Sequence, residues 1–101
     1  IVIEDYVNIR AGVRIYDTDF HPIAAADRRA HRREAIKMAP VRLCEDVWLG
    51  ANVIVSKGVT IGARSIIGVG SIVTRDVPPD TLAAGVPARP MRSLAMKNGQ
   101  P

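Results

Sequence analysis

The sequence predicts an all-β domain whose chain winds into a parallel β-helix of about three coils. Two observations support this prediction. A period of six residues holds without a break over 43–78, and the chain is 48 % hydrophobic although aromatic residues make up only 4 % of it. Neither the 3.6-residue period of a helix nor the alternation of an ordinary strand gives a period of six. Hexapeptide repeats are typical of parallel β-helices, whose narrow core has little room for rings.

Each block of six has a defined inner side. The first residue is branched and aliphatic, and the fifth is small or compact, so both are expected to point inward. Glycine is frequent in the second place, where we expect it to relax the backbone at a bend. Three blocks close one triangular coil, and successive coils lie about 4.8 Å apart. The first places are Leu43, Leu49, Val55, Ile61, Ile67 and Val73, and the fifth places are Val47, Val53, Val59, Ser65, Ser71 and Val77.

The same phase organises the rest of the chain, which we expect to form a single domain over 1–101. Residues 3–20 form a first coil with Ile3, Ile9 and Ile15 inside. The second and third coils are 43–60 and 61–78. Because proline cannot donate to a strand ladder, Pro78-Pro79 is predicted to end the solenoid. The tail, 79–101, is predicted to cap the open end and to include a helical turn over 93–97. We also expect further sequence before Ile1, because the chain begins already in phase.

A loop over 21–42 interrupts the repeat and is strongly basic, with Arg28, Arg29, Arg32, Arg33 and Lys37. A helical turn or two is possible between residues 27 and 38. Two interpretations remain open. The loop is a solvated excursion, or it is an arm that reaches a neighbouring subunit, an acidic acceptor or a cofactor phosphate.

Composition narrows the classes of partner. A net charge of +4 with arginine in excess suits a phosphate-bearing ligand, whereas the scarcity of aromatic residues disfavours single-stranded nucleic acid. The single cysteine, Cys44, gives neither a disulfide framework nor a cysteine zinc site. No signal peptide or membrane-length apolar run is present, so a cytoplasmic protein is expected. The flat faces of a short prism predict a homo-oligomer, most simply a three-fold one.

The chain contains two histidines, His21 and His31, of which His21 is the candidate for catalysis. It lies where the first coil gives way to the loop, close in sequence to Asp17 and Asp19. Imidazole is the natural general base near neutral pH, and a nearby carboxylate can fix its tautomer. Asp19 occupies an inward or corner place in the repeat, where a carboxylate is costly unless paired. For His31 a structural or surface role is expected.

Four phrases then reveal a resemblance: VWLG at 47–50, GVTIG at 58–62, GSIVTRDVP at 70–78 and AGVPAR at 84–89. With them, residues 1–92 resemble the hexapeptide-repeat acetyltransferases, and within these the maltose, galactoside and polysaccharide O-acetyltransferases. The resemblance implies a left-handed β-helix, a homotrimer, and acetyl-CoA as co-substrate in a groove between two prisms, without a metal. The implied reaction is direct transfer of acetyl to a hydroxyl of a sugar or polysaccharide.

The resemblance also assigns roles to residues of this chain. His21 matches the general base, and the backbone amide of Ala51 matches the group that faces the thioester carbonyl. Tail arginines match contacts to the phosphates of CoA. The cofactor-binding residues that the resemblance implies are Ala51, Val69, Thr74, Arg75, Arg89 and Arg92.

Other functions remain open. The acceptor is an amine or an antibiotic in some relatives. The antibiotic-modifying relatives usually show GGNP where this chain has AGVP at 84–87, which favours a sugar, and amine acceptors remain open. The chain is alternatively a non-catalytic or truncated solenoid that at most binds CoA. A zinc enzyme similar to the γ-class carbonic anhydrases needs three histidines from stacked coils, and no repeat block of this chain supplies one.

Overall fold

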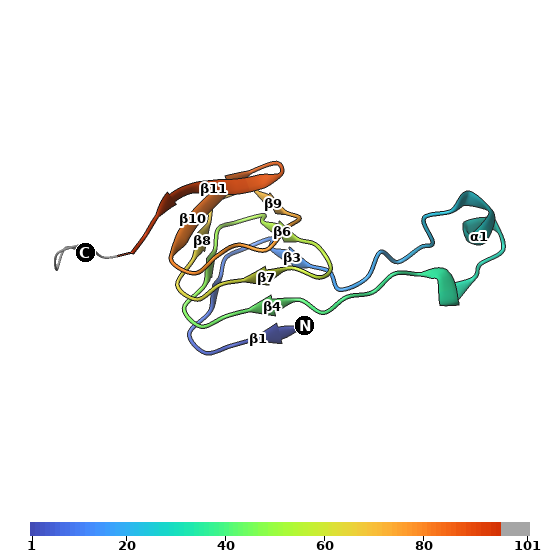
Figure 1. The fold of residues 1–101 in the computed structure, drawn as a ribbon, viewed down its shortest axis with the longest axis horizontal. Helices are drawn as coiled ribbons and strands as arrows, with labels where there is room; N and C mark the ends of the chain where they lie inside the picture. Colours follow the sequence, from blue (N-terminus) through green and yellow to red (C-terminus); the bar gives the residue numbers. More distant parts are fainter. Residues whose placement is uncertain (96–101) are drawn as a thin grey trace.

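The computed structural model describes residues 1–95 and shows a three-sided solenoid with a long arm (Figure 1). Nine two-residue strands stack in parallel on three faces, as predicted, and an antiparallel hairpin closes one end. The faces are β1-β4-β7, β3-β6-β9 and β2-β5-β8, and β10 and β11 extend the last of these. The strands are β1 Val2–Ile3, β2 Asn8–Ile9, β3 Arg14–Ile15, β4 Arg42–Leu43, β5 Trp48–Leu49, β6 Ile54–Val55, β7 Thr60–Ile61, β8 Ile66–Ile67, β9 Ile72–Val73, β10 Thr81–Gly85 and β11 Ala88–Ser93.

The predicted inner side is confirmed in the two coils over 43–78. Every strand from β1 to β9 ends on a first-place residue of the repeat. All six first-place residues of this stretch, from Leu43 to Val73, are at most 1 % exposed. The six fifth-place residues are buried as well, the least buried being Val77 at 6 %. In the first coil Ile3 and Ile9 are 48 % and 41 % exposed, because no coil lies below them among the described residues.

The bends fall at the fourth place of the block, which corrects the expectation for the second-place glycines. Seven of the nine fourth-place residues of the repeat have positive φ, among them Tyr6, Asp46, Asn52 and Arg64, whereas Thr18 and Asp76 do not. The second-place glycines serve close packing instead. A Cβ on Gly50 would lie 2.8 Å from the backbone nitrogen of Val69 in the next coil, and one on Gly62 would lie 2.3 Å from that of Pro79. Glycine is therefore needed there because neighbouring backbones approach it.

The arm, residues 17–40, leaves the solenoid at the corner that follows β3 and returns at the start of β4. The last rung bond before it is the Tyr16 amide to the Val55 carbonyl, 2.9 Å. The outgoing and returning segments of the arm then pair in antiparallel fashion. The Asp19 amide donates to the Lys37 carbonyl and the Ala39 amide to the Asp17 carbonyl, both at 3.0 Å. The tip contains α1, Ala25–Arg29, and a 3-10 turn, Arg33–Ala35, so short helical turns form as predicted.

The tail does more than cap the prism. β10 pairs in parallel with β8, Leu82 beside Ile66, so the solenoid continues for a fourth rung on this face beyond Pro78-Pro79. The prediction that the two prolines end it is therefore wrong. The prolines shorten the coil instead. Residues paired between β5 and β8 are eighteen positions apart in the sequence, whereas those paired between β8 and β10 are only sixteen apart. β11 then folds back on β10 and closes the stack. Ser93 ends β11, so no helix begins there, and the rest of the predicted turn lies partly outside the described residues.

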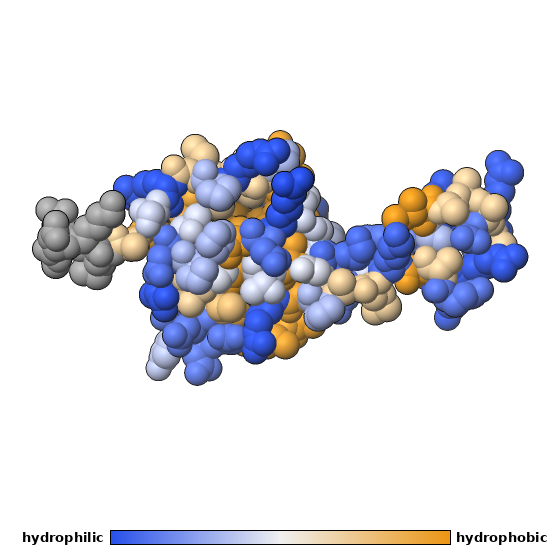
Figure 2. Space-filling view, viewed as in Figure 1, coloured by the Kyte–Doolittle hydropathy of each residue, from blue (hydrophilic) through white to orange (hydrophobic). Residues whose placement is uncertain are grey.

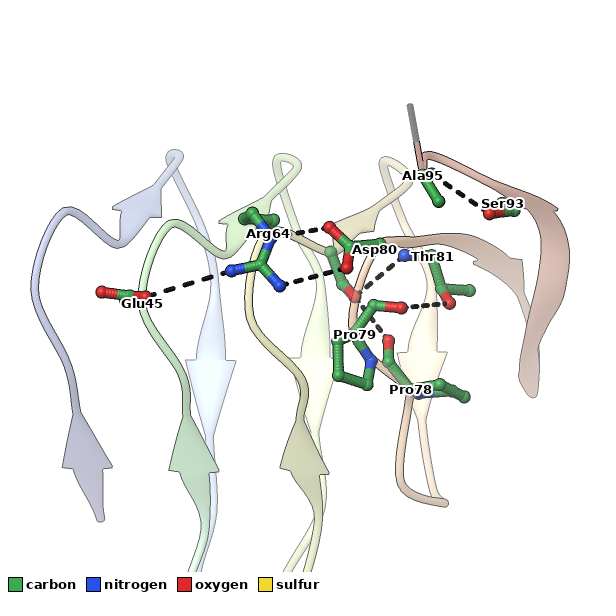
Figure 3. A network of polar contacts seen from close by, with 9 residues as sticks. Glu45, Arg64, Pro78, Pro79, Asp80, Thr81, Ser93 and Ala95 are labelled. Atoms are coloured by element: carbon green, nitrogen blue, oxygen red, sulfur yellow. Dashed lines mark hydrogen bonds and ion pairs between the residues drawn. The ribbon is translucent and has the colours of Figure 1, made fainter. Parts of the chain in front are cut away.

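Polar contacts fasten this shortened coil to the one beneath it (Figure 3). The buried Ser65 hydroxyl donates to the Pro78 carbonyl at 2.6 Å and accepts from the Thr81 amide at 3.1 Å. On the surface, the Arg64 guanidinium donates to both carboxylate oxygens of Asp80, at 2.7 and 3.1 Å, and lies 4.0 Å from Glu45. Ser65, the compact residue predicted at this inward fifth place, thus also hydrogen-bonds to the segment above it, from Pro78 to Thr81.

The Arg64–Asp80 pair predicts a pH dependence of stability. Hydrogen bonding from Arg64 lowers the pKa of the Asp80 carboxyl in the folded protein. A lowered folded pKa gives a stabilising contribution that is present above the unfolded value, about 3.9, and is lost as the pH falls through the folded value. We therefore expect Asp80→Asn to unfold less steeply with acid below about pH 4 than the parent chain. Urea unfolding measured at a series of pH values checks this.

Asparagine suits the test because it tolerates the positive φ of residue 80. The matched control is Asp5→Asn, since the Asp5 carboxylate is exposed and forms no ion pair with residues 1–95. An identical acid dependence for Asp80→Asn and the parent chain would contradict the prediction.

Candidate active site

His21 lies on the arm, at the wall of a hollow of about 310 Å³ formed by the tip. Its side chain is exposed, and its backbone N–H donates to the Asp19 carbonyl at 2.7 Å. Figure 2 shows this tip standing clear of the solenoid, with a largely hydrophilic surface interrupted by hydrophobic patches. The imidazole is therefore accessible to a ligand that enters the hollow.

The two carboxylates near His21 in the sequence, Asp17 and Asp19, lie at the base of the arm and not beside the imidazole. Asp19 Oδ1 lies 2.9 Å from Lys57 Nζ of the second coil. Among residues 1–95, no hydrogen bond joins either carboxylate to the His21 imidazole. The expectation that Asp19 takes an inward or corner place of the repeat is wrong, because the chain has already left the solenoid there. Asp19 and Lys57 tie the arm to the second coil.

The hollow also contains residues that are not among the individual site residues predicted from the sequence. His31 lines it, although a structural or surface role was expected for this residue, and so do three of the arginines of the basic loop. The signal was present in the density of basic residues, but the sequence does not tell which of them converge. The converging residues are His21, His31, Arg28, Arg32 and Arg33.

A second group of candidates lies on one corner of the solenoid, which we call the Ala51 corner. Here the turns after β2, β5 and β8 stack: the Asn52 amide donates to the Ala11 carbonyl and the Gly70 amide to the Ala51 carbonyl, both at 2.9 Å. The Ala51 amide itself donates to no backbone carbonyl among residues 1–95. Val69, directly above, is 74 % exposed. The corner thus offers a free amide and an apolar surface along one line.

The remaining candidates are distributed over other places. Arg89 pairs with Ala84 on the hairpin, next to Gly68, so it continues the line of the Ala51 corner. Arg92 pairs with Leu82, toward the opposite end of β10. Thr74 and Arg75 follow β9 at the corner from which the arm leaves. The side chains of Thr74 and Arg75 are exposed, and so are those of Arg89 and Arg92.

One chain therefore brings Ala51, Val69 and Arg89 together but holds His21 on the arm, which leaves from a different corner. Within residues 1–95, no group of three histidine, cysteine or acidic side chains is placed to hold a metal ion. No helix in this described range has the length and apolar character that crossing a membrane requires.

Comparisons with known proteins agree with the hexapeptide-repeat fold. Residues 40–75 match the family described as bacterial transferase hexapeptide (six repeats). The chain is 51 % identical over 55 residues to a galactoside O-acetyltransferase of Escherichia coli, a match covering 54 % of this chain and 27 % of the relative. A maltose O-acetyltransferase structure from Clostridium difficile superposes with a TM-score of 0.82 at 39 % identity, covering 93 % of this chain and 49 % of that one.

A hexapeptide-repeat acetyltransferase from Vibrio cholerae, solved with acetyl coenzyme A, superposes with a TM-score of 0.74 at 32 % identity. The match covers 94 % of this chain and 60 % of that one. This chain thus spans less than two thirds of the length of each of these relatives. In the part that it spans, it is similar to hexapeptide-repeat acetyltransferases.

Proposed function

We propose that this chain is the β-helical part of an acetyl-CoA-dependent O-acetyltransferase that acts on a hydroxyl of a sugar or polysaccharide. The observation that carries the proposal is its match, over 94 % of its length, to an acetyltransferase solved with acetyl coenzyme A. The names of the galactoside and maltose relatives support a sugar as acceptor. We further infer from the resemblance that the coil is left-handed.

In the proposed reaction His21 is the general base. Its imidazole removes the proton from the acceptor hydroxyl as the oxygen attacks the thioester carbonyl. A C–O bond forms, the C–S bond breaks, and the proton passes from His21 to the departing sulfur. The products are the acetyl ester and CoA, so no covalent acyl-enzyme is needed. The Ala51 amide, which has no backbone partner among residues 1–95, donates to the carbonyl oxygen as negative charge develops there.

A homotrimer completes the proposed site. The arm places His21 away from the Ala51 corner of its own chain, and the arm tip extends a molecule whose longest dimension is 58 Å against 25 and 23 Å. In the trimer, the arm of one subunit reaches the Ala51 corner of the next. Acetyl-CoA then runs between two prisms past Ala51, Val69 and Arg89, with Thr74 and Arg75 of the facing prism on its other side.

The arginines of β11 give a prediction about CoA binding. Arg89 and Arg92 are exposed and form no ion pair with residues 1–95, so their charge is available to the phosphates of CoA. Charge-assisted hydrogen bonds contribute about 1.5–3 kcal/mol each, so Arg89→Ala with Arg92→Ala is expected to weaken CoA binding at least tenfold. Its salt dependence should also become shallower. Calorimetric titration at two salt concentrations measures both.

The control for that double variant is Arg29→Ala, which removes an exposed charge on α1 and should leave CoA affinity unchanged. Equal CoA affinity in the double variant and the parent chain would remove both arginines from the site.

The function itself is tested by release of free thiol from acetyl-CoA over a panel of sugars, amines and antibiotics. We expect release that depends on a sugar with a free hydroxyl. Release with amines alone would make the chain an N-acetyltransferase, and release with antibiotics alone would make the acceptor an antibiotic rather than a sugar. CoA binding without release for any acceptor would make it a non-catalytic solenoid.

A further inference from the structure

The hollow at the arm tip has the composition of a binding site for an anion. Its lining includes three arginines and both histidines of the chain, together with apolar surface from Phe20 and Ile36. Its volume of about 310 Å³ is at the lower end of the range of small-molecule pockets, about 300–1,000 Å³. A bare ion would leave most of this space unfilled, whereas one sugar unit with a charged substituent is of suitable size.

The three arginines of the hollow differ in what they already contact. Arg28 donates to the carbonyl oxygens of Pro22 and Ile23, so it holds the segment that follows His21. Arg32 Nε lies 3.5 Å from Asp27 Oδ1 and is partly neutralised. The Arg33 guanidinium forms no hydrogen bond or ion pair with residues 1–95. Arg33 is therefore the cation whose charge remains available to a ligand.

Charge over the outer part of the arm, residues 21–38, favours the same class of ligand. Between residues 21 and 38 there are five arginines and lysines but only two carboxylates, Asp27 and Glu34. Only Asp27 pairs with an arginine of the hollow. Guanidinium groups that lack a carboxylate partner bind carboxylates and phosphates through paired hydrogen bonds.

We propose that this hollow is the acceptor site and that the acceptor is an anionic saccharide, whose carboxylate or phosphate binds Arg33 with help from Arg32. The apolar surface of Phe20 and Ile36 packs against the sugar ring. Because His21 shares the hollow, an acceptor held in this way presents a hydroxyl to the general base. This inference rests on the proposed function and names its substrate class.

Binding is tested on the full chain without any need for turnover. The imidazole Cε1–H signals of the two histidines are followed by NMR at fixed pH and ionic strength. Galacturonate, its uncharged methyl ester and galactose 6-phosphate are titrated in turn. We expect saturable shifts of both signals with galacturonate or galactose 6-phosphate, and binding at least tenfold weaker for the methyl ester. Comparing the two anions distinguishes a carboxylate acceptor from a phosphorylated one.

Two variants identify the arginine. Arg33→Gln keeps a polar side chain but removes the charge, and it should weaken binding of the anionic sugar about tenfold, as the loss of one charged hydrogen bond predicts. Arg29→Gln is the matched control, because Arg29 lies on the same arm but does not line the hollow. In the thiol-release assay, Arg33→Gln should raise KM for the anionic acceptor about tenfold and leave kcat and the KM for acetyl-CoA unchanged.

The outcomes separate this inference from the function on which it rests. Equal binding of galacturonate and its methyl ester, or no effect of Arg33→Gln, would overturn the anionic acceptor even if acetyl transfer to neutral sugars is observed. A raised KM for acetyl-CoA in Arg33→Gln would assign the hollow to the cofactor's phosphates and would also overturn it. Charge-dependent sugar binding with no acetyl transfer would uphold the anion site but contradict the proposed acetyltransferase function.

Discussion

Replacing His21 by alanine is expected to lower kcat for acetyl transfer by about 10²–10⁴-fold, the usual contribution of general-base catalysis. The affinity for CoA should change little, because the proposed CoA contacts lie on the solenoid and the hairpin rather than on the arm. The fold should also persist: the hydrogen bond that fixes residue 21 within the arm comes from its backbone N–H, not from the imidazole. Initial rates of thiol release at saturating acceptor, with calorimetry of CoA binding, measure the two effects.

His21→Asn serves as the companion variant. The amide side chain can hydrogen-bond to an acceptor hydroxyl but cannot take up its proton, so its kcat should fall as far as that of His21→Ala. A near-normal rate in either variant would show that another group removes the proton. A large loss of kcat in His21→Ala together with a small loss in His21→Asn would show that residue 21 positions the acceptor rather than deprotonating it.

Much of the solenoid could be predicted because its information is local and repeated. Leu49 and Ile67 occupy the same place in successive coils, and the structure stacks one on the other. The place of the bends could not be assigned in this way. Positive φ falls on residues as different as Asn52, Arg64 and Gly70, so side-chain type does not mark the fourth place. The second-place glycines were explained wrongly because their role depends on backbone from the next coil.

The arm could be predicted only as a basic excursion. Its attachment depends on an ion pair between Asp19 of the arm and Lys57 of the second coil, and this pairing follows from no repeat. The hollow depends on how α1 and the 3-10 turn fold back toward His21, which no periodicity encodes. The fourth rung was missed for a related reason: Pro78-Pro79 signals an end, whereas the structure uses the pair to shorten the coil before β10 resumes the stack.

Truncating Ile67 should give the largest loss of stability in the solenoid. Its side chain is 0 % exposed and lies between Leu49 below and Ala83 above, so it joins the second coil to the capping rung. Ile67→Ala removes buried methyl groups and leaves a cavity that short, hydrogen-bonded strands cannot close, at a cost of about 2–5 kcal/mol. Because each coil of a solenoid contacts only its neighbours, the loss also weakens attachment of the hairpin above. Urea unfolding at fixed protein concentration measures the cost.

The adjacent Ile66 provides a matched control of the same residue type in the same strand. It points outward from β8 and is only half-buried, so Ile66→Ala removes the same atoms without opening a core cavity. We expect it to cost less than half as much as Ile67→Ala. Ile67→Val, which removes one methylene, should cost about 0.5–1.5 kcal/mol and fall between the parent chain and alanine. If the two alanine variants unfolded at the same urea concentration, the period of six would not separate an inner from an outer side. The stacked first-place residues would then not be what holds the coils together.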